Sequence, residues 1–222
     1  HDADTLFLQT PEHTFLDESR PARLRERTFA MLTFGAQFLD GELDGWPDLL
    51  LANGHVDRSY DPNVPDLMPP QYFKNLGDAK FEELPGPSLG EYFQKQYLGR
   101  TIAILDWNRD GKEDACISHL DAPAALLTNR TPHAGHYLAV RLCGRVGNRD
   151  AIGSLVELAA GDRKWTRQVI GGNGYFATNE RKLVFGLGRA ERIDRLQVRW
   201  PSGRKQTLQN VTADQELTIV EE

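Results

Sequence analysis

Short apolar segments separated by polar turns run along the whole chain. LFLQT (6–10), FGAQFLD (34–40) and PDLLLANG (47–54) are rich in Phe, Leu and Ala, and Gly, Pro, Asp or Asn bound them. Such segments are typical of β-strands joined by turns. No stretch keeps the long period of an amphipathic helix, although SLGEYFQKQY (88–97) allows a short one. The pattern therefore predicts an all-β fold.

The apolar segments recur after 66 positions. That shift places LFLQT on YFKNL (72–76) and FGAQFLD on RTIAILD (100–106), and two further pairs align in the same order. Four strands per unit is the size of a propeller blade, and a closed propeller typically uses about 4 to 8 blades. We therefore predict two units, 1–66 and 67–130. They are either blades of an incomplete ring, with further blades upstream in a longer parent chain, or units that pack on another element.

A different pattern begins near residue 136 and continues to the C-terminus. In IDRLQVRW (193–200), Leu196, Val198 and Trp200 alternate with polar residues, and HYLAVRL (136–142) alternates in the same way. Seven such strands with Gly-rich or polar turns predict an antiparallel, sandwich-like domain over residues 131–222. The stretch GGNGYFA (171–177) predicts a hairpin, because the strand-turn-helix context of a dinucleotide fingerprint does not follow it.

The two halves of the chain carry opposite charge. Residues 1–125 hold 22 Asp and Glu against 11 Lys and Arg, whereas the whole chain of 222 residues has a net charge of -6. An acidic half argues against nucleic acid as a partner, because phosphate contacts need Lys and Arg. The basic half is expected to be solvated, to dock on the acidic half or to hold an acidic ligand.

Cysteine and hydropathy place few further constraints. Cys116 and Cys143 are the only cysteines, so a single bridge between them or none at all remains open, and no C-x-x-C spacing indicates zinc or redox chemistry. No run approaches the roughly 20 apolar residues of a membrane span. We therefore expect no membrane span. Because two blades cannot close a ring, we also expect the chain to be the C-terminal part of a longer protein.

Acidic residues gather in two loops at the same place in each repeat. LDGELDGWPDLLL (39–51) and LDWNRDGKEDACI (105–117) carry oxygen side chains at loop positions 1, 3, 5 and 9, and glycine at position 6. Calcium takes about 6 to 8 oxygen ligands, so a tight loop must converge several of them. Without His or Cys, this donor set favours a hard cation over zinc or copper. The candidate calcium ligands of the two sites, with the carbonyls of Trp46 and Lys112 at position 7, are Asp40, Glu42, Asp44, Trp46 and Asp48, then Asp106, Asn108, Asp110, Lys112 and Asp114.

An EF-hand is the obvious competing interpretation. It requires a bidentate glutamate at position 12 and flanking helices. Position 12 is Leu51 in the first loop and Ile117 in the second, and both lie in strand-like apolar runs. The sequence therefore predicts calcium loops between two strands.

These residues resemble a known family combination. FGAQFLDGELDGWPDLLLANG and GRTIAILDWNRDGKEDACISH are similar to the FG-GAP/VCBS repeats of integrin-type propellers, although Glu42 stands where Asp or Asn is usual. GNRDAIGSLVEL (147–158), VIGGNGYFAT (169–178), FGLG (185–188) and VRWPSG (198–203) resemble the ASPIC/UnbV domain that follows such repeats in cartilage acidic protein and its bacterial relatives.

The resemblance implies a secreted or cell-surface interaction or adhesion module, without catalytic activity, in which calcium is structural. Its partner would be a protein or a polysaccharide. An alternative is an accessory or catalytic protein of natural-product biosynthesis of the enediyne type, with a site where the acidic repeats meet the basic domain. A second alternative is a glycan-binding module that uses a basic face formed by Arg195, Arg199, Arg204 and Lys205.

Overall fold

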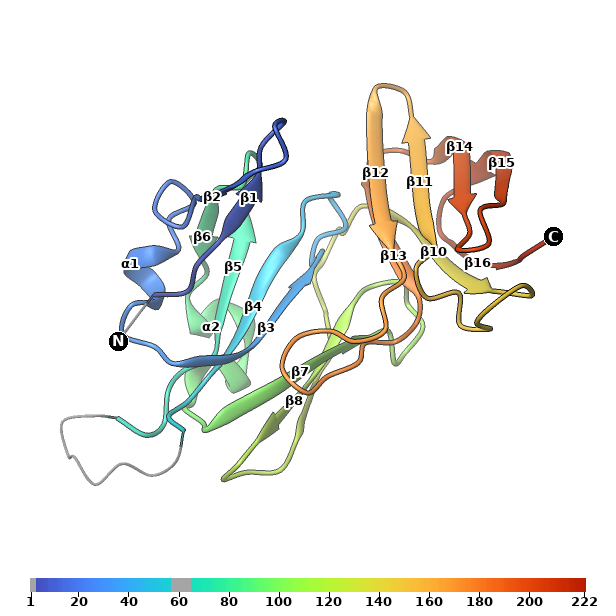
Figure 1. Cartoon of the computed structure of the whole chain (residues 1–222). Coiled ribbons are helices and arrows are strands. Elements are labelled where there is room, and N and C mark those ends of the chain that lie inside the picture. The colour runs from blue at the N-terminus through green and yellow to red at the C-terminus, as the bar shows by residue number, and fades with distance from the viewer. Residues whose placement is uncertain (1–2, 57–64) are drawn as a thin grey trace.

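The computed structural model describes residues 3–56 and 65–222. The fold is mostly β: several small, mainly antiparallel sheets account for the strands, and the helices are short. Figure 1 shows the sheets of the N-terminal half and those of the C-terminal half as two groups that meet along one side. The end of the predicted first repeat, 57–64, lies outside the described residues. None of the helices in the described part of the chain is long and apolar enough to cross a membrane.

Within the described residues, nine strands and the short helices make up the N-terminal half. A small hairpin comes first, then a four-stranded sheet in the order β3-β4-β5-β6, then a three-stranded sheet in the order β7-β8-β9. The sequence allowed a short helix over 88–97. The turn η1 lies within that stretch, and α2 overlaps its start. The elements are β1 (Phe7–Gln9), β2 (Phe15–Asp17), α1 (Arg25–Thr28), β3 (Thr33–Leu39), β4 (Asp48–Asn53), β5 (Gln71–Asn75), β6 (Phe81–Glu83), α2 (Gly86–Leu89), η1 (Glu91–Gln94), β7 (Gly99–Leu105), β8 (Asp114–His119) and β9 (Ala125–Leu127).

The two acidic loops close equivalent hairpins. One joins β3 to β4 and the other joins β7 to β8, and both hairpins are antiparallel. The paired strands are offset from the sequence repeat, because β5 and β6 follow residue 66 yet complete the sheet that β3 and β4 begin. The domain boundaries drawn from the repeat stay a prediction.

Strands β3 and β7 bring the two sheets together. Gln37 Nε2 donates a hydrogen bond to the carbonyl oxygen of Ile102 (3.1 Å) across this junction. Gly35 permits the approach, because a Cβ atom there would lie 2.6 Å from the carbonyl oxygen of Arg100. Apolar side chains from both sheets fill the space between them, namely Leu39, Leu50, Ala52, Ile102, Ile104, Ala115 and Ile117.

The seven strands expected in the C-terminal part are present. They form a three-stranded sheet, β13-β10-β16, and a four-stranded sheet, β12-β11-β14-β15. A single apolar cluster contains residues of both sheets, as in a sandwich, and Leu196, Val198 and Trp200 are buried in it as predicted. The strands are β10 (His136–Cys143), β11 (Leu155–Ala160), β12 (Arg163–Gln168), β13 (Leu183–Gly188), β14 (Arg192–Arg199), β15 (Lys205–Thr212) and β16 (Gln215–Val220).

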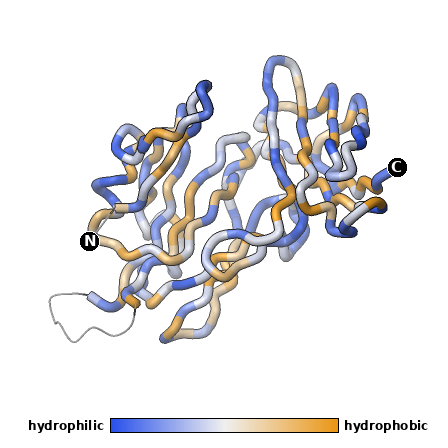
Figure 2. The backbone as a smooth tube through the Cα atoms, viewed as in Figure 1, coloured by the Kyte–Doolittle hydropathy of each residue, from blue (hydrophilic) through white to orange (hydrophobic). Residues whose placement is uncertain are grey.

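One pairing corrects the expectation of a wholly antiparallel domain. Strand β16 runs parallel to β10, with Val140 opposite Leu217. The alternation of apolar residues fixes which face of a strand is buried but carries no information about its direction. Because the other strands of the domain lie between β10 and β16 in sequence, the chain can return to β10 in the same direction. Figure 2 shows the apolar positions spread along the strands and the polar ones gathered at the turns.

The glycine at the β3–β7 junction gives a test of this packing. We expect Gly35→Ala to lower the free energy of unfolding by about 1–3 kcal/mol, because the added methyl group overlaps backbone that cannot move aside. Gly171→Ala is the control, since a Cβ atom there meets only the Ile152 side chain at 3.7 Å. Urea unfolding of both variants measures the difference. Equal stability of the two would contradict the close approach.

Candidate functional site

The two acidic loops have the same backbone shape. Position 4 has positive φ in both, with Leu43 at 57° and Arg109 at 59°. Position 6 also has positive φ, with Gly45 at 91° and Gly111 at 84°. Non-glycine residues adopt this conformation rarely, so its occurrence at matching positions indicates that the loop sequence specifies it twice.

The same hydrogen bonds hold both loops. The N–H groups of positions 5 and 6 donate to the two carboxylate oxygens of position 1. In the first loop these bonds to Asp40 are 3.0 and 2.7 Å long, and in the second loop both bonds to Asp106 are 3.1 Å long. The N–H group of position 2 donates to position 9, at 3.0 Å on Asp48 and 3.1 Å on Asp114. The N–H group of position 7 donates to position 5. The first and ninth acids therefore organise each loop.

The ninth acid also fixes the following strand. Asp48 Oδ1 accepts the N–H of Asn75 (2.8 Å), and Asp114 Oδ1 accepts the N–H of Asn129 (2.7 Å). Asn129 Nδ2 in turn donates to the carbonyl oxygen of Gly41 in the first loop (2.9 Å). The second sheet is thus tied to the first loop as well as to its own.

Lysine side chains contact several of the predicted ligands. Lys74 of β5 pairs with Glu42, Lys112 lies 3.3 Å from Asp110, and Lys182 lies 3.0 Å from Asp106. In the second loop Asn108 Oδ1 accepts the N–H of Asp110 (3.2 Å). Among the described residues no three His, Cys, Asp or Glu side chains gather as a bound metal would require. The predicted ligands therefore lie in the expected loops, with their oxygens turned to backbone N–H groups and to lysines.

Burial raises the pKa of several loop carboxyls. Desolvation is the main cause in each case, and it brings the pKa of Asp40 to about 7 and that of Asp48 to about 6. The same cause raises the pKa of Asp114. The folded chain therefore keeps protons on these groups at a pH where the unfolded chain has released them.

The C-terminal domain packs directly on both loops. The ring of Tyr137 covers Gly111 so closely that a side chain there would overlap it, and a Cβ atom on Gly45 would lie 2.7 Å from Trp165 Nε1. Arg163 donates to the carbonyl oxygen of Asp44 (2.7 Å), and the N–H of Gly188 donates to that of Leu43 (2.8 Å). The position 6 glycines are needed both for their positive φ and for this contact.

A buried ion cluster joins the second loop to the domain. Lys182, with only 2% of its side chain exposed, faces Asp106 at 3.0 Å, Glu180 at 3.5 Å and Glu216 at 3.6 Å. Glu180 Oε2 accepts the N–H of Asp106 (3.1 Å), and its other oxygen pairs with Arg141. Sequence analysis missed Lys182 because its partner lies 76 positions away in the chain.

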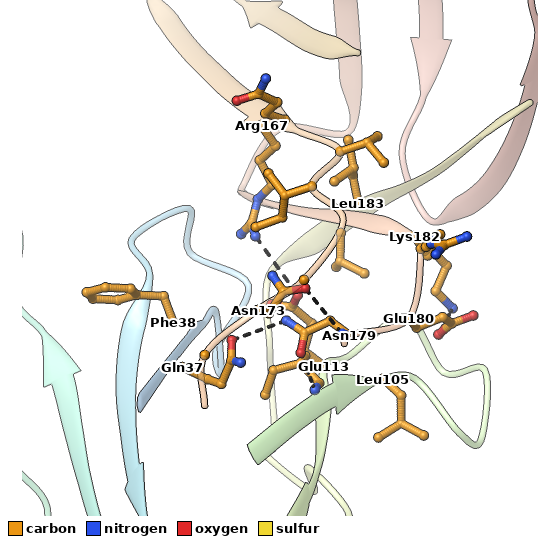
Figure 3. Close-up of a pocket in the computed structure, with 18 of the residues that line it drawn as sticks. Gln37, Phe38, Leu105, Glu113, Arg167, Asn173, Asn179, Glu180, Lys182 and Leu183 are labelled. Atoms are coloured by element: carbon orange, nitrogen blue, oxygen red, sulfur yellow. Dashed lines mark hydrogen bonds and ion pairs between the residues drawn. The ribbon is translucent and has the colours of Figure 1, made fainter. Parts of the chain in front are cut away.

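A cavity of about 450 Å³ lies between the repeats and the C-terminal domain. Figure 3 shows its polar residues, which come from both parts of the chain. Asn179 bridges the two parts: its Nδ2 donates to Gln37 Oε1 (3.2 Å), and its Oδ1 accepts the N–H of Ile104 (2.9 Å). Glu113, at position 8 of the second loop, is buried in the same wall.

Comparison with known families agrees with part of this organisation. Residues 144–222 match the family described as ASPIC and UnbV. This segment is an ASPIC/UnbV domain. No FG-GAP/VCBS repeat is detected, and no curated protein matches the chain. Strand β10 precedes the matched residues yet lies between β13 and β16, so the folded ASPIC/UnbV unit includes it.

Two further features of the structure concern cysteine and histidine. Both cysteines are free, so no disulfide joins Cys116 to Cys143. His136 Nδ1 lies 2.7 Å from Asp214 Oδ2, which gives that ring a partner within the ASPIC/UnbV domain.

The Lys182 cluster leads to a stability prediction. We expect Lys182→Met to lower the free energy of unfolding by about 3–5 kcal/mol, because it leaves the buried Asp106 carboxylate without its cation. Lys95→Met removes an exposed pair with Glu91 and should have a much smaller effect, because solvent screens that pair. Urea unfolding at neutral pH measures both. Similar losses in the two variants would contradict the assignment of Lys182 as the cation of the junction.

The raised pKa values lead to a pH prediction for the calcium-free protein. Between the unfolded pKa, near 3.8, and the folded pKa, about 7 for Asp40, the folded chain binds more protons than the unfolded chain. Its stability should therefore fall as pH rises from 5 to 8. Thermal melting in EDTA across that range measures the slope. Asp40→Asn should make the slope of stability against pH shallower, whatever the stability of the variant itself. An unchanged slope would contradict the assignment of this pH dependence to Asp40.

Proposed function

We propose that the chain is a calcium-stabilised extracytoplasmic interaction module without catalytic activity. The supporting observation is the match between the two loops, which share positive φ at positions 4 and 6 and the same side-chain to backbone hydrogen bonds. The oxygen-only donor set fits a hard cation. A secreted or cell-surface location accords with this proposal, because calcium sites of modest affinity are filled outside the cell.

The proposed ligands are those predicted from the sequence. In the first loop they are Asp40, Glu42, Asp44 and Asp48 with the carbonyl of Trp46. In the second they are Asp106, Asn108, Asp110 and Asp114 with the carbonyl of Lys112. Calcium would supply charge neutralisation for acids that now rely on backbone N–H groups and lysines. The chain's own part is to hold the first and ninth acids in place before the cation binds.

We further propose that the two N-terminal sheets are FG-GAP/VCBS blades. Strands β3 to β6 are consecutive, antiparallel neighbours in a four-stranded sheet, which is the blade arrangement. Strands β3 and β7 lie side by side, as the inner strands of successive blades do. A closed ring would need further blades outside these residues.

Calcium titration of the EDTA-treated protein tests the calcium proposal. Calorimetry should give two sites, and melting in parallel should show stabilisation that reaches about 2.7 kcal/mol for each site at a free calcium concentration of a hundred times its Kd. Asp44→Ala and Asp110→Ala should each remove one site, and the double variant should melt independently of calcium. Asp162→Ala, in an exposed turn outside the loops, is the control. A calcium response that survives in the double variant would sink the proposal.

A second candidate function is an accessory or catalytic role in natural-product biosynthesis. The observation that favours it is the carboxylate of Glu113 in the cavity where the repeats meet the ASPIC/UnbV domain, since Glu113 is not a proposed calcium ligand. Glycan binding by the basic face has less support, because Arg199 pairs with Glu157 (3.4 Å) and Arg204 is hydrogen-bonded to the backbone of Glu222.

A further inference from the structure

The cavity at the junction contains a charged pair that is too far apart to bond directly. A guanidinium nitrogen of Arg167, from β12, lies 3.9 Å from Glu113 Oε1. Glu113 Oε2 accepts the N–H of Asp40 (3.0 Å), so one carboxylate oxygen is already occupied. Within the described residues, the Arg167 side chain makes no hydrogen bond. A hydroxyl oxygen beside the pair, about 2.8 Å from each group, could accept from Arg167 and donate to Glu113 at once.

The charges around the cavity balance. Its acidic residues are Asp106, Glu113 and Glu180, and its basic residues are Arg167, Arg181 and Lys182. Two of the basic groups are committed, since Lys182 belongs to the buried ion cluster and Arg181 pairs with Asp150. Arg167, the remaining cation of the lining, already faces Glu113. An anionic ligand would therefore add a negative charge to a balanced set, whereas a neutral ligand leaves the balance unchanged.

Amide groups add further hydrogen-bonding capacity. Asn173 Oδ1 accepts the N–H of Asn179 (3.2 Å), and its Nδ2 has no hydrogen-bond partner in the described part of the chain. Gln168 is also in the lining, and Ile170 and Leu183 contribute apolar surface. Figure 3 shows Asn173, Asn179 and Glu113 close together below Arg167. A few polar groups on a partly apolar wall, in a space of about 450 Å³, match the usual form of a small-molecule site.

We propose that this cavity binds a neutral polyhydroxylated ligand, a sugar ring, with one hydroxyl beside Glu113 and Arg167 and another near the Asn173 amide. A sugar ring presents adjacent hydroxyls that both donate and accept, together with C–H faces that suit Ile170 and Leu183. The proposal gives the interaction module a ligand class. It does not depend on the calcium proposal, because Glu113, Arg167 and Asn173 are not among the proposed calcium ligands.

The test is an NMR titration of the isotope-labelled chain, with calcium and again with EDTA. The probes are the methyl glycosides of glucose, galactose and mannose at millimolar concentrations, with sodium glucuronate as the anionic comparison. At least one glycoside should shift the backbone amide signals of residues that border the cavity. A failed calcium titration together with saturable glycoside shifts would reject the calcium proposal alone.

Variants locate the binding. Arg167→Met and Asn173→Ala should each weaken the glycoside affinity, by about tenfold for Arg167→Met because a charged donor is lost. Arg192→Met, on an exposed strand position away from the cavity and outside the basic face, should leave it unchanged. Glu113→Gln keeps an acceptor for the Asp40 N–H and carries the test if Arg167→Met fails to fold. The proposal is overturned if no glycoside shifts the cavity signals, if these variants bind as the parent does, or if glucuronate binds there more tightly than the glycosides.

Discussion

The close packing of the ASPIC/UnbV domain on the two acidic loops is the contact on which the rest of the arrangement depends. Tyr137 lies on Gly111, and Trp165 lies against Gly45, so the same glycine that bends each loop also admits an aromatic side chain. A larger residue at either position would strain the loop and push the domain away. Local backbone shape and domain docking are therefore determined by the same two residues.

That packing also explains why the cavity exists. The docking contacts lie on either side of it: Arg163 and Gly188 bond the first loop, and Lys182 bonds the second. Between them, the side chains of Arg167 and Glu113 face each other without meeting. Because the surrounding contacts fix both backbones, the two groups stay 3.9 Å apart. The cavity of about 450 Å³ beside them is open to water or to a ligand.

Much of the architecture follows from the sequence, and the parts that do not follow have physical reasons. Alternation predicted β14 and the burial of Leu196 and Val198, because a two-residue period reports directly on which face is buried. The direction of β16 could not be predicted, since the period is the same for parallel and antiparallel pairing.

The candidate site also contains residues that the sequence predicted and residues that it did not. The spacing of Asp40, Gly45 and Asp48 predicted a tight acidic loop, because the bonds that form it are local. Lys182, directly before β13, and Arg167, in β12, act on the loops from distant parts of the chain, and no local pattern marks them. Glu113 lay within the predicted loop, but its role depends on the domain that faces it.

The two loops are equivalent in their backbone but not in their surroundings. In the first, the buried Asp40 accepts only backbone N–H groups among the described residues, and Lys74 pairs with the partly exposed Glu42 instead. In the second, the buried Asp106 already has the ammonium of Lys182. A cation at the first loop would therefore relieve an unpaired buried acid, whereas at the second it would compete with a lysine that also holds Glu180 and Glu216. On this argument, occupancy of the second loop alters the contact between the repeats and the ASPIC/UnbV domain, and occupancy of the first does so far less.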